Sequence, residues 1–206
     1  ARYLRPGDHE SHTPIYVVWE ITLACDLGCK HCGSRAGKAR PDELTTEQCL
    51  DVVREMDEIG VREVTLIGGE AYLRDDWDVI ATEITRRGMN CSMATGARNL
   101  TQDRVDRAAA AGMRAISISI DGLERTHDAQ RGPRGAFAAA VEAAERVAKS
   151  PIRLSFNTQI NRLSMPELPA IADLLVELGG KAWQLQLTVP MGRAADRPDL
   201  LLQPYD

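Results

Sequence analysis

Short runs of apolar and β-branched residues alternate along this 206-residue chain with stretches of helical periodicity. The runs predict six strands, at residues 15–23, 62–67, 90–95, 115–120, 152–158 and 183–189. The periodic stretches predict five helices between them, at residues 45–59, 77–86, 101–110, 136–149 and 166–178. Strand–helix alternation requires parallel strands joined by right-handed crossovers. The pattern therefore predicts an α/β fold, either an open doubly wound sheet or a barrel or partial barrel.

Both architectures place function at the carboxyl ends of the strands. Small or polar residues follow every predicted strand at this point. In chain order they are the cysteine-rich residues 25–32 and residues 68–70, 95–96, 119–122, 157–158 and 190–193. A packed core requires none of these clusters, so their convergence predicts a single active-site rim.

Composition limits the classes of function. The chain is 44% hydrophobic and 27% charged, which is ordinary for a globular protein. We expect an amino-terminal arm at residues 1–14, a core domain at 15–192, and a tail at 193–206 that either ends the protein or begins a further domain. The net charge of −5 argues against a nucleic-acid partner or an anionic membrane surface. No apolar run approaches the ~20 residues of a membrane span.

Three of the five cysteines, Cys25, Cys29 and Cys32, fall within eight residues. Structural zinc usually has four protein ligands, and His31 is a poor fourth ligand because it lies directly beside Cys32. Three thiolates on a four-iron cluster leave one iron free for an exogenous ligand. An open cluster, a zinc site and unmetallated thiols are the alternatives. The odd cysteine count and the tight spacing indicate a metal or redox thiol in the cytoplasm rather than a disulfide framework.

A second motif, Gly68-Gly69-Glu70, follows the second predicted strand. It fits a plain turn, but after a parallel strand the glycines also let backbone approach a ligand, and the glutamate offers a carboxylate to a cationic group. Together with Cys-x3-Cys-x2-Cys after the first strand, this motif resembles the radical S-adenosylmethionine enzymes. The resemblance runs from about Trp19 to Gly192.

The resemblance implies a partial six-stranded β/α barrel, which agrees with the six predicted strands. It also implies a [4Fe-4S] cluster on Cys25, Cys29 and Cys32, with S-adenosylmethionine chelated to the open iron through its amino and carboxylate groups. In this family the cluster reductively cleaves the sulfonium to a 5′-deoxyadenosyl radical, which abstracts a substrate hydrogen. An external flavodoxin- or ferredoxin-like donor would supply the electron.

The same resemblance implies a set of residues around S-adenosylmethionine. Gly68, Gly69 and Glu70 would lie at the methionyl amino group, and Arg131 at the methionyl carboxylate. Ser119 and Asp121 would lie near the ribose and methionyl part, and Asn157 at the ribose hydroxyls. The His31 backbone and residues 187–192, beginning at Leu187, would surround the adenine. On the sequence alone, Arg131 also fits a solvated turn charge and Asn157 a turn former. His127 is expected to order its loop rather than to take part in the chemistry.

Residues 127–137 resemble the His-Asp-x-x-Arg-Gly-x-x-Gly-x-Phe run of the peptide-modifying, SPASM-type branch of the family. This implies a ribosomally made peptide or protein as substrate. Two alternatives stay open: a radical enzyme acting on a small molecule such as a haem precursor, and a non-catalytic iron–sulfur or zinc protein. Only Cys49 and Cys91 remain outside the motif, and both are expected to be buried apolar residues, so these residues predict no auxiliary cluster. Ala71 replaces the family's usual proline and leaves Glu70 intact.

Overall fold

Six parallel strands pair in chain order, so neighbours in the sheet are also neighbours in the sequence. The computed structural model describes residues 5–8, 10 and 12–204. Its strands are β1 (Tyr16–Glu20), β2 (Glu63–Ile67), β3 (Asn90–Thr95), β4 (Ala115–Ser119), β5 (Arg153–Ile160) and β6 (Trp183–Leu187). All six predicted strands are confirmed.

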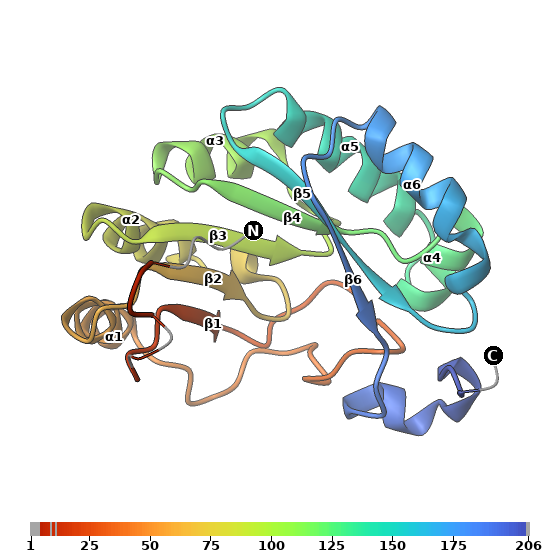
Figure 1. The fold of residues 1–206 in the computed structure, drawn as a ribbon, viewed down its shortest axis with the longest axis horizontal. Helices are drawn as coiled ribbons and strands as arrows, with labels where there is room; N and C mark the ends of the chain where they lie inside the picture. Colours follow the sequence, from red (N-terminus) through yellow and green to blue (C-terminus); the bar gives the residue numbers. More distant parts are fainter. Residues whose placement is uncertain (1–4, 9, 11, 205–206) are drawn as a thin grey trace.

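The strand order selects between the two architectures. In a doubly wound sheet the order reverses at a switch point, whereas here it runs from β1 to β6 without reversal. The sheet curls, so that β6 runs steeply across the direction of β1 (Figure 1). No pairing joins β1 to β6 among the described residues. The fold is therefore a partial (β/α)6 barrel, as predicted.

Helices cover the outer face of the curled sheet (Figure 1). The five predicted ones are α1 (Thr46–Glu58), α2 (Trp77–Arg86), α3 (Gln102–Ala110), α5 (Ala136–Ala148) and α6 (Leu168–Glu177). The hydroxyl of Thr101 accepts the Arg104 N–H and caps α3. Short 3-10 helices are η1 (Ala71–Leu73), η2 (Met165–Glu167), η3 (Gly192–Asp196) and η4 (Pro198–Leu200). None of the described helices has the length and apolar character needed to cross a bilayer.

The two faces of the sheet differ in chemistry. Outer side chains such as Leu66 and Ile118 are fully buried in the core beneath the helices. Most inner side chains are small or polar, with Ile67 as an exception. Among them, Thr65 shares hydrogen bonds with the Tyr16 hydroxyl (3.0 Å) and the Ser92 hydroxyl (2.8 Å). Closed eight-stranded barrels fill this interior with bulky branched side chains. The half-barrel keeps room for a ligand instead, and its stability comes from the outer layer.

A sixth helix, α4 (Glu124–Arg131), lies outside the predicted set. Its sequence ERTHDAQR contains one alanine and no larger apolar residue, so hydrophobic periodicity gives no indication of it. The side chains that it buries are polar, namely His127, Gln130 and Arg131. Gly132, with a φ of 102°, ends the helix in a conformation that favours glycine.

The buried imidazole of His127 holds the loop after β4, in keeping with the expectation that it orders this loop. Its Nδ1 accepts the Asp121 backbone N–H (3.1 Å), and its ring lies edge-on to Phe137, with 5.8 Å between the centroids. Burial and the nearby Arg131 lower the pKa of His127 to about 4. The folded protein therefore keeps this imidazole neutral at pH values where an unfolded chain protonates it.

We expect His127 to make the folded state less stable as the pH falls from 6.5 to about 4, because only the unfolded chain takes up the proton there. The loss attributable to this group is about 3 kcal/mol across that window. In His127→Asn, whose side-chain oxygen can accept the same N–H, this part of the slope should vanish. Urea unfolding from pH 7 to 4 measures it, with the exposed His12→Asn as control. Identical slopes in wild type and His127→Asn would contradict the shift.

Candidate functional site

The three clustered cysteines lie in the loop between β1 and α1, at the carboxyl end of β1. Glu43 orders the start of this loop, because its Oε1 accepts the Leu23 N–H (2.8 Å) and the Thr22 hydroxyl (3.0 Å). The Cys25 N–H donates to the Gly37 carbonyl (3.0 Å), which folds the loop back on itself. The loop is thus held by hydrogen bonds of its own.

Each of the three sulfur atoms accepts one hydrogen bond. In the order Cys25, Cys29 and Cys32, the donors are the Leu27 N–H (3.4 Å), Nη1 of Arg131 (3.7 Å) and the Ala36 N–H (3.3 Å). Apolar Leu27 and Ala136 pack around the thiols. Burial raises the pKa of Cys25 to about 12, and it also raises the pKa of Cys29. Metals bind thiolates, so metal uptake at this loop would release protons.

The spacing of the sulfurs separates a single ion from a cluster. Two thiolates on one zinc ion lie at most ~4.6 Å apart, because each Zn–S bond is about 2.3 Å. The Sγ atoms of Cys25, Cys29 and Cys32 do not all lie within 4.8 Å of one another. Among the described residues, the set that does meet this limit is Cys25 with Asp26 and Glu70. The three sulfurs are therefore not gathered around one zinc ion, whereas a cluster does not require this, because its thiolates bind different irons.

Residues 68–70 pack backbone to backbone against the cysteine loop. A Cβ on Gly69 would lie 2.1 Å from the Ala24 carbonyl oxygen, and one on Gly68 would lie 2.6 Å from that of Thr22. This approach lets the Gly69 N–H donate to Thr22 (2.8 Å) and the Glu70 N–H donate to Ala24 (2.7 Å). The two glycines therefore join two rim segments and bring Glu70 beside the cysteines.

The carboxylate of Glu70 is buried, with 2% of the residue exposed. It accepts hydrogen bonds from the Thr95 hydroxyl and from the Gly96 N–H (2.7 Å), both at the end of β3. Burial raises the pKa of Glu70 to about 7, against the lowering effect of these two bonds. Near neutral pH this group is available both as a carboxylate and as a carboxylic acid.

Asp121, which is fully buried, joins three segments of the rim. Its Oδ2 accepts bonds from Nε (2.7 Å) and Nη2 (2.6 Å) of Arg131 and lies 3.2 Å from His31 Nε2. Its Oδ1 accepts the Gln159 N–H (2.8 Å). Burial opposes ionisation, but Arg131 and His31 hold the pKa of Asp121 well below its usual range. Arg131 is thus a buried ion-pair partner that reaches Cys29, and not a solvated turn charge.

One cavity of about 280 Å³ collects nearly all the predicted site residues. They are Cys25, Cys29, His31, Cys32, Gly68, Gly69, Glu70, Ser119, Asp121, Arg131 and Asn157. Asn157 lies within β5 and not in a turn. Leu187 lies apart from this group: it is 63% exposed and lines, with His31, a neighbouring cavity of about 450 Å³.

Two glutamines of the same cavity escape the sequence analysis. Gln159 and Gln186 line it, and Gln159 Nε2 donates to Gln186 Oε1 (2.9 Å). Strand residues two apart share a face, and Gln159 stands two residues beyond Asn157. The two-residue period of a strand is therefore the sequence feature that could have identified Gln159 as a site residue.

The segment after β6 returns to the cysteine loop, where the blue and orange parts of the chain meet in Figure 1. The Arg193 N–H donates to the Cys32 carbonyl (2.9 Å), and its guanidinium donates to the Ala36 carbonyl (3.1 Å). A Cβ on Gly192 would lie 2.2 Å from the Gly33 carbonyl oxygen, so this approach requires glycine. The rim is therefore closed by contact between loop and tail.

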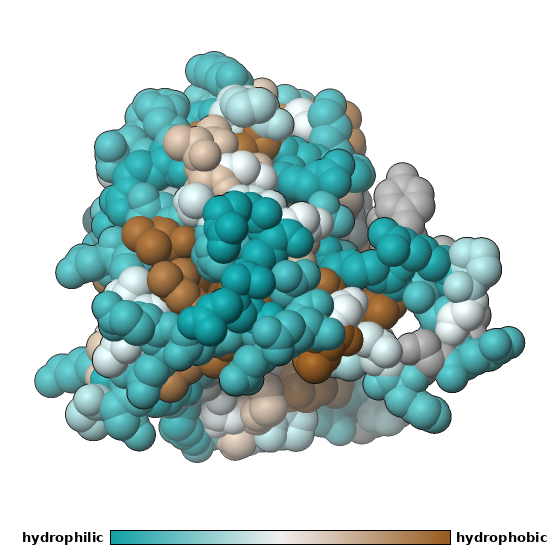
Figure 2. Space-filling view, turned by 90° about the vertical axis from the view of Figure 1, so that its left-hand side faces the viewer, coloured by the Kyte–Doolittle hydropathy of each residue, from teal (hydrophilic) through white to brown (hydrophobic). Residues whose placement is uncertain are grey.

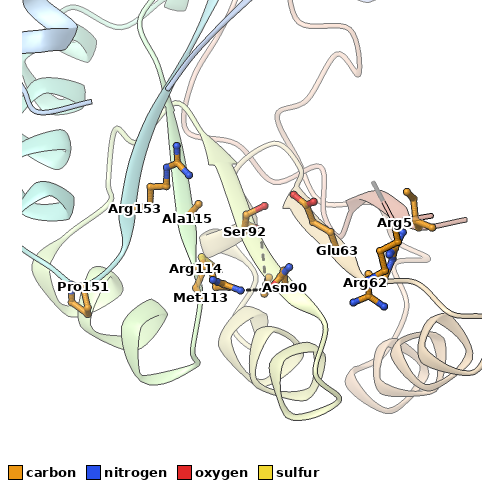
Figure 3. A pocket seen from close by; sticks show the side chains of 12 residues that line it. Arg5, Arg62, Glu63, Asn90, Ser92, Met113, Arg114, Ala115, Pro151 and Arg153 are labelled. Carbon is orange, nitrogen blue, oxygen red and sulfur yellow. Dashed lines mark hydrogen bonds between the residues drawn. The ribbon is translucent and has the colours of Figure 1, made fainter. Parts of the chain in front are cut away.

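A larger cavity, of about 650 Å³, lies at the opposite end of the strands (Figure 3). Arginines line it, namely Arg5, Arg62, Arg114 and Arg153. Three of them, Arg62, Arg114 and Arg153, stand at the starts of β2, β4 and β5. Figure 2, which faces the side where β1 to β3 begin, shows a mainly hydrophilic surface. None of the three clustered cysteines lines this cavity, so the cysteine rim is the candidate site.

Comparison with known proteins adds an independent line of support. The model of the Radical SAM superfamily matches residues 19–175. AdoMet-dependent heme synthase of Methanosarcina barkeri is 32% identical, over 95% of this chain and 57% of its own length. Mycofactocin maturase MftC of Mycobacterium ulcerans is also 32% identical, over 95% of this chain and 53% of its own length. The chain spans about half the length of the curated relatives that it matches.

A solved structure supports the fold. SuiB of Streptococcus suis, bound to precursor peptide SuiA, is similar with a TM-score of 0.76 at 17% identity, over 85% of this chain and 40% of that one. The superfamily match carries with it S-adenosylmethionine and an iron–sulfur cluster as cofactors, and the cysteine loop fits such a cluster. By its matched model, its partial barrel and its cysteine rim, the chain belongs to the Radical SAM superfamily.

Proposed function

We propose that the protein reductively cleaves S-adenosylmethionine at a [4Fe-4S] cluster and uses the resulting radical to abstract a hydrogen from a peptide substrate. Cys25, Cys29 and Cys32 would hold the cluster, and its four-iron type is supported by the resemblance of their Cys-x3-Cys-x2-Cys spacing to the family's motif. The observation that carries the proposal is the meeting of these thiols with the buried carboxylate of Glu70 in one cavity. When bound, the cluster supplies the electron that cleaves the sulfonium, while the protein supplies position and a dry site.

The chain's own residues bind and orient S-adenosylmethionine in this proposal. Gly68 and Gly69 let backbone approach it, and Glu70 accepts from its methionyl amino group. Arg131 reaches the methionyl carboxylate with Nη1, because Asp121 already occupies its Nε–Nη2 edge. The other proposed contacts are Asp121 near the methionyl part, Ser119 and Asn157 at the ribose, and the His31 backbone and Leu187 at the adenine.

The inner face of the half-barrel favours a peptide as substrate. Buried amide groups need hydrogen-bond partners, and this face offers the side chains of Ser92, Asn157, Gln159 and Gln186. The flat ring of a tetrapyrrole, although it bears carboxylates at its edge, is matched better by apolar walls. The maturase MftC and the peptide-bound SuiB agree with this choice. The 32% identity to a heme synthase keeps a haem precursor as the second candidate.

The surroundings of the reaction follow from the same proposal. All five cysteines are free thiols, which fits the reducing cytoplasm. An external flavodoxin- or ferredoxin-like protein would donate the electron. We assign the reaction to a core at residues 15–192, with residues 1–14 as an arm and residues from 193 as a tail or the beginning of a further domain.

Cysteine variants test the cluster. Anaerobically reconstituted protein should bind about four irons per chain at one site, and Cys25→Ala, Cys29→Ala and Cys32→Ala should each abolish it. Cys91→Ala is the matched control, because Cys91 is a fully buried thiol outside the loop. Iron and sulfide analysis with visible spectroscopy reads the result. Stoichiometric zinc without iron, in protein kept from oxygen, would overturn the assignment.

Glu70→Gln tests the S-adenosylmethionine site separately from the metal. At pH 8 the wild-type carboxylate is ionised, and losing its charged hydrogen bond should weaken binding about tenfold to a hundredfold. At pH 6 the difference should shrink, because a carboxyl whose pKa is about 7 is then mostly protonated and resembles glutamine. Calorimetry on iron-loaded protein measures the S-adenosylmethionine affinity at both pH values, with a substitution of the exposed Glu142, Glu142→Gln, as control. A loss that does not change with pH would contradict this role.

Product analysis tests the reaction itself. Reduced, cluster-loaded full-length protein should release 5′-deoxyadenosine and methionine slowly alone and faster with substrate, and Arg131→Ala should slow this at unchanged iron content. Chromatography under argon measures the nucleoside. Mass spectrometry after co-expression with a short peptide encoded beside the gene, compared with incubation with a haem precursor, separates the two substrates. An intact, reducible cluster that binds S-adenosylmethionine and yields no 5′-deoxyadenosine would leave only a passive cluster protein.

A further inference from the structure

The three thiols differ in what donates to them. The sulfurs of Cys25 and Cys32 accept backbone N–H groups, which are neutral. The sulfur of Cys29 accepts from the guanidinium of Arg131, whose Nη1 lies 3.7 Å away. One corner of the site therefore has a full positive charge beside its sulfur, and the other two do not.

This charge is buried, so it acts strongly on its neighbours. Arg131 is 8% exposed, and charges interact more strongly in a protein interior than in water. A reduced cluster carries one more negative charge than an oxidised one. A cation beside a sulfur ligand therefore favours the reduced form and raises the reduction potential, since net charge and hydrogen bonds to the sulfurs set that potential.

Asp121 opposes this effect from the other edge of the same guanidinium. Both bonds from Arg131 end on its Oδ2, while the Gln159 N–H holds Oδ1. This arrangement fixes the plane of the guanidinium and turns Nη1 toward Cys29. His31 also contacts Asp121, and the carboxylate of Glu70 contributes to the field at Arg131. Gln159 and His31 therefore hold Asp121 in place, and Asp121 in turn holds the guanidinium beside the sulfur.

We propose that the Asp121–Arg131 pair sets the reduction potential of the cluster through Cys29. Arg131 raises the potential, and Asp121 both positions the guanidinium and limits the rise. The inference rests on the proposed function in one respect, that Cys29 ligates the cluster. The step concerned is a one-electron transfer: the oxidised cluster gains an electron, the reductant loses one, and no bond forms or breaks.

The two halves of the pair should shift the potential in opposite directions. In iron-loaded full-length protein, Arg131→Gln should lower the midpoint potential, and Asp121→Asn should raise it by leaving the cation uncompensated. We expect each to change the reduction equilibrium about tenfold, which is about 59 mV for one electron. The double variant should lie between them, with a non-additive shift because the residues touch. Titration with a low-potential reductant under argon, followed by electron paramagnetic resonance, measures this without any turnover.

The partly exposed ion pair of Asp78 on α2 and Arg107 on α3 supplies the matched control. Asp78→Asn and Arg107→Gln remove the same charges from a pair that does not line the cavity of the clustered cysteines, and they should leave the potential unchanged. If Arg131→Gln does not retain iron, Arg131→Lys replaces it in the test, because lysine keeps the positive charge. The midpoint potential of Arg131→Lys should then stay near that of the wild type, while that of Asp121→Asn rises.

The outcomes separate this inference from the function on which it rests. Shifts of the same sign, or no shift beyond the controls at full iron content, overturn the role of the pair and leave the cluster assignment standing. An Arg131→Lys potential displaced as far as that of Asp121→Asn also overturns it. Wild-type protein that takes up no iron overturns the proposed function and this inference together.

Discussion

The structure of the active-site rim depends on the ion pair and hydrogen bonds that surround the buried carboxylate of Asp121. A buried charge costs several kcal/mol unless partners surround it, and here they come from three places: Arg131 on α4, His31 in the cysteine loop and Gln159 on β5. None of these segments satisfies the charge alone. Burying Asp121 therefore requires the loop, the helix and the strand to meet, and their meeting forms the cavity around the thiols.

The two faces of the curled sheet have different roles. The outer face carries the apolar core, with Leu66 and Ile118 fully buried beneath the helices. The inner face carries hydroxyls and amides such as Thr65, Ser92 and Gln159. A closed barrel would fill this space with packed side chains. Within the described part of the chain β1 and β6 do not pair with each other, which keeps the space open. The same polar lining makes the interior suitable for amide-bearing ligands.

Much of the fold follows from the sequence, because hydrophobic periodicity is a local property. The six strands, five of the helices and the rim position of Glu70 are all readable from runs and turns. Helix α4 is not, since its buried side chains are polar and their partners lie far along the chain. The burial of Arg131 cannot be predicted from the sequence, because it depends on the ion pair with Asp121, which only the folded structure shows. The pairing of Gln159 with Gln186 is hidden for the same reason, although strand period places Gln159 on the correct face.

The contact between the tail and the cysteine loop sets a limit on when the site can exist during synthesis. The Arg193 N–H and the Cys32 carbonyl that it contacts are separated by 161 positions, from 32 to 193. A ribosome adding about 5–20 residues per second needs roughly 10–30 s to cover that interval. During that time the loop has been made, while the strand and tail that close over it have not. The three thiols are then as open to oxidation as those of any unfolded chain, so a nascent chain of this fold depends on a reducing environment before it can depend on its own structure.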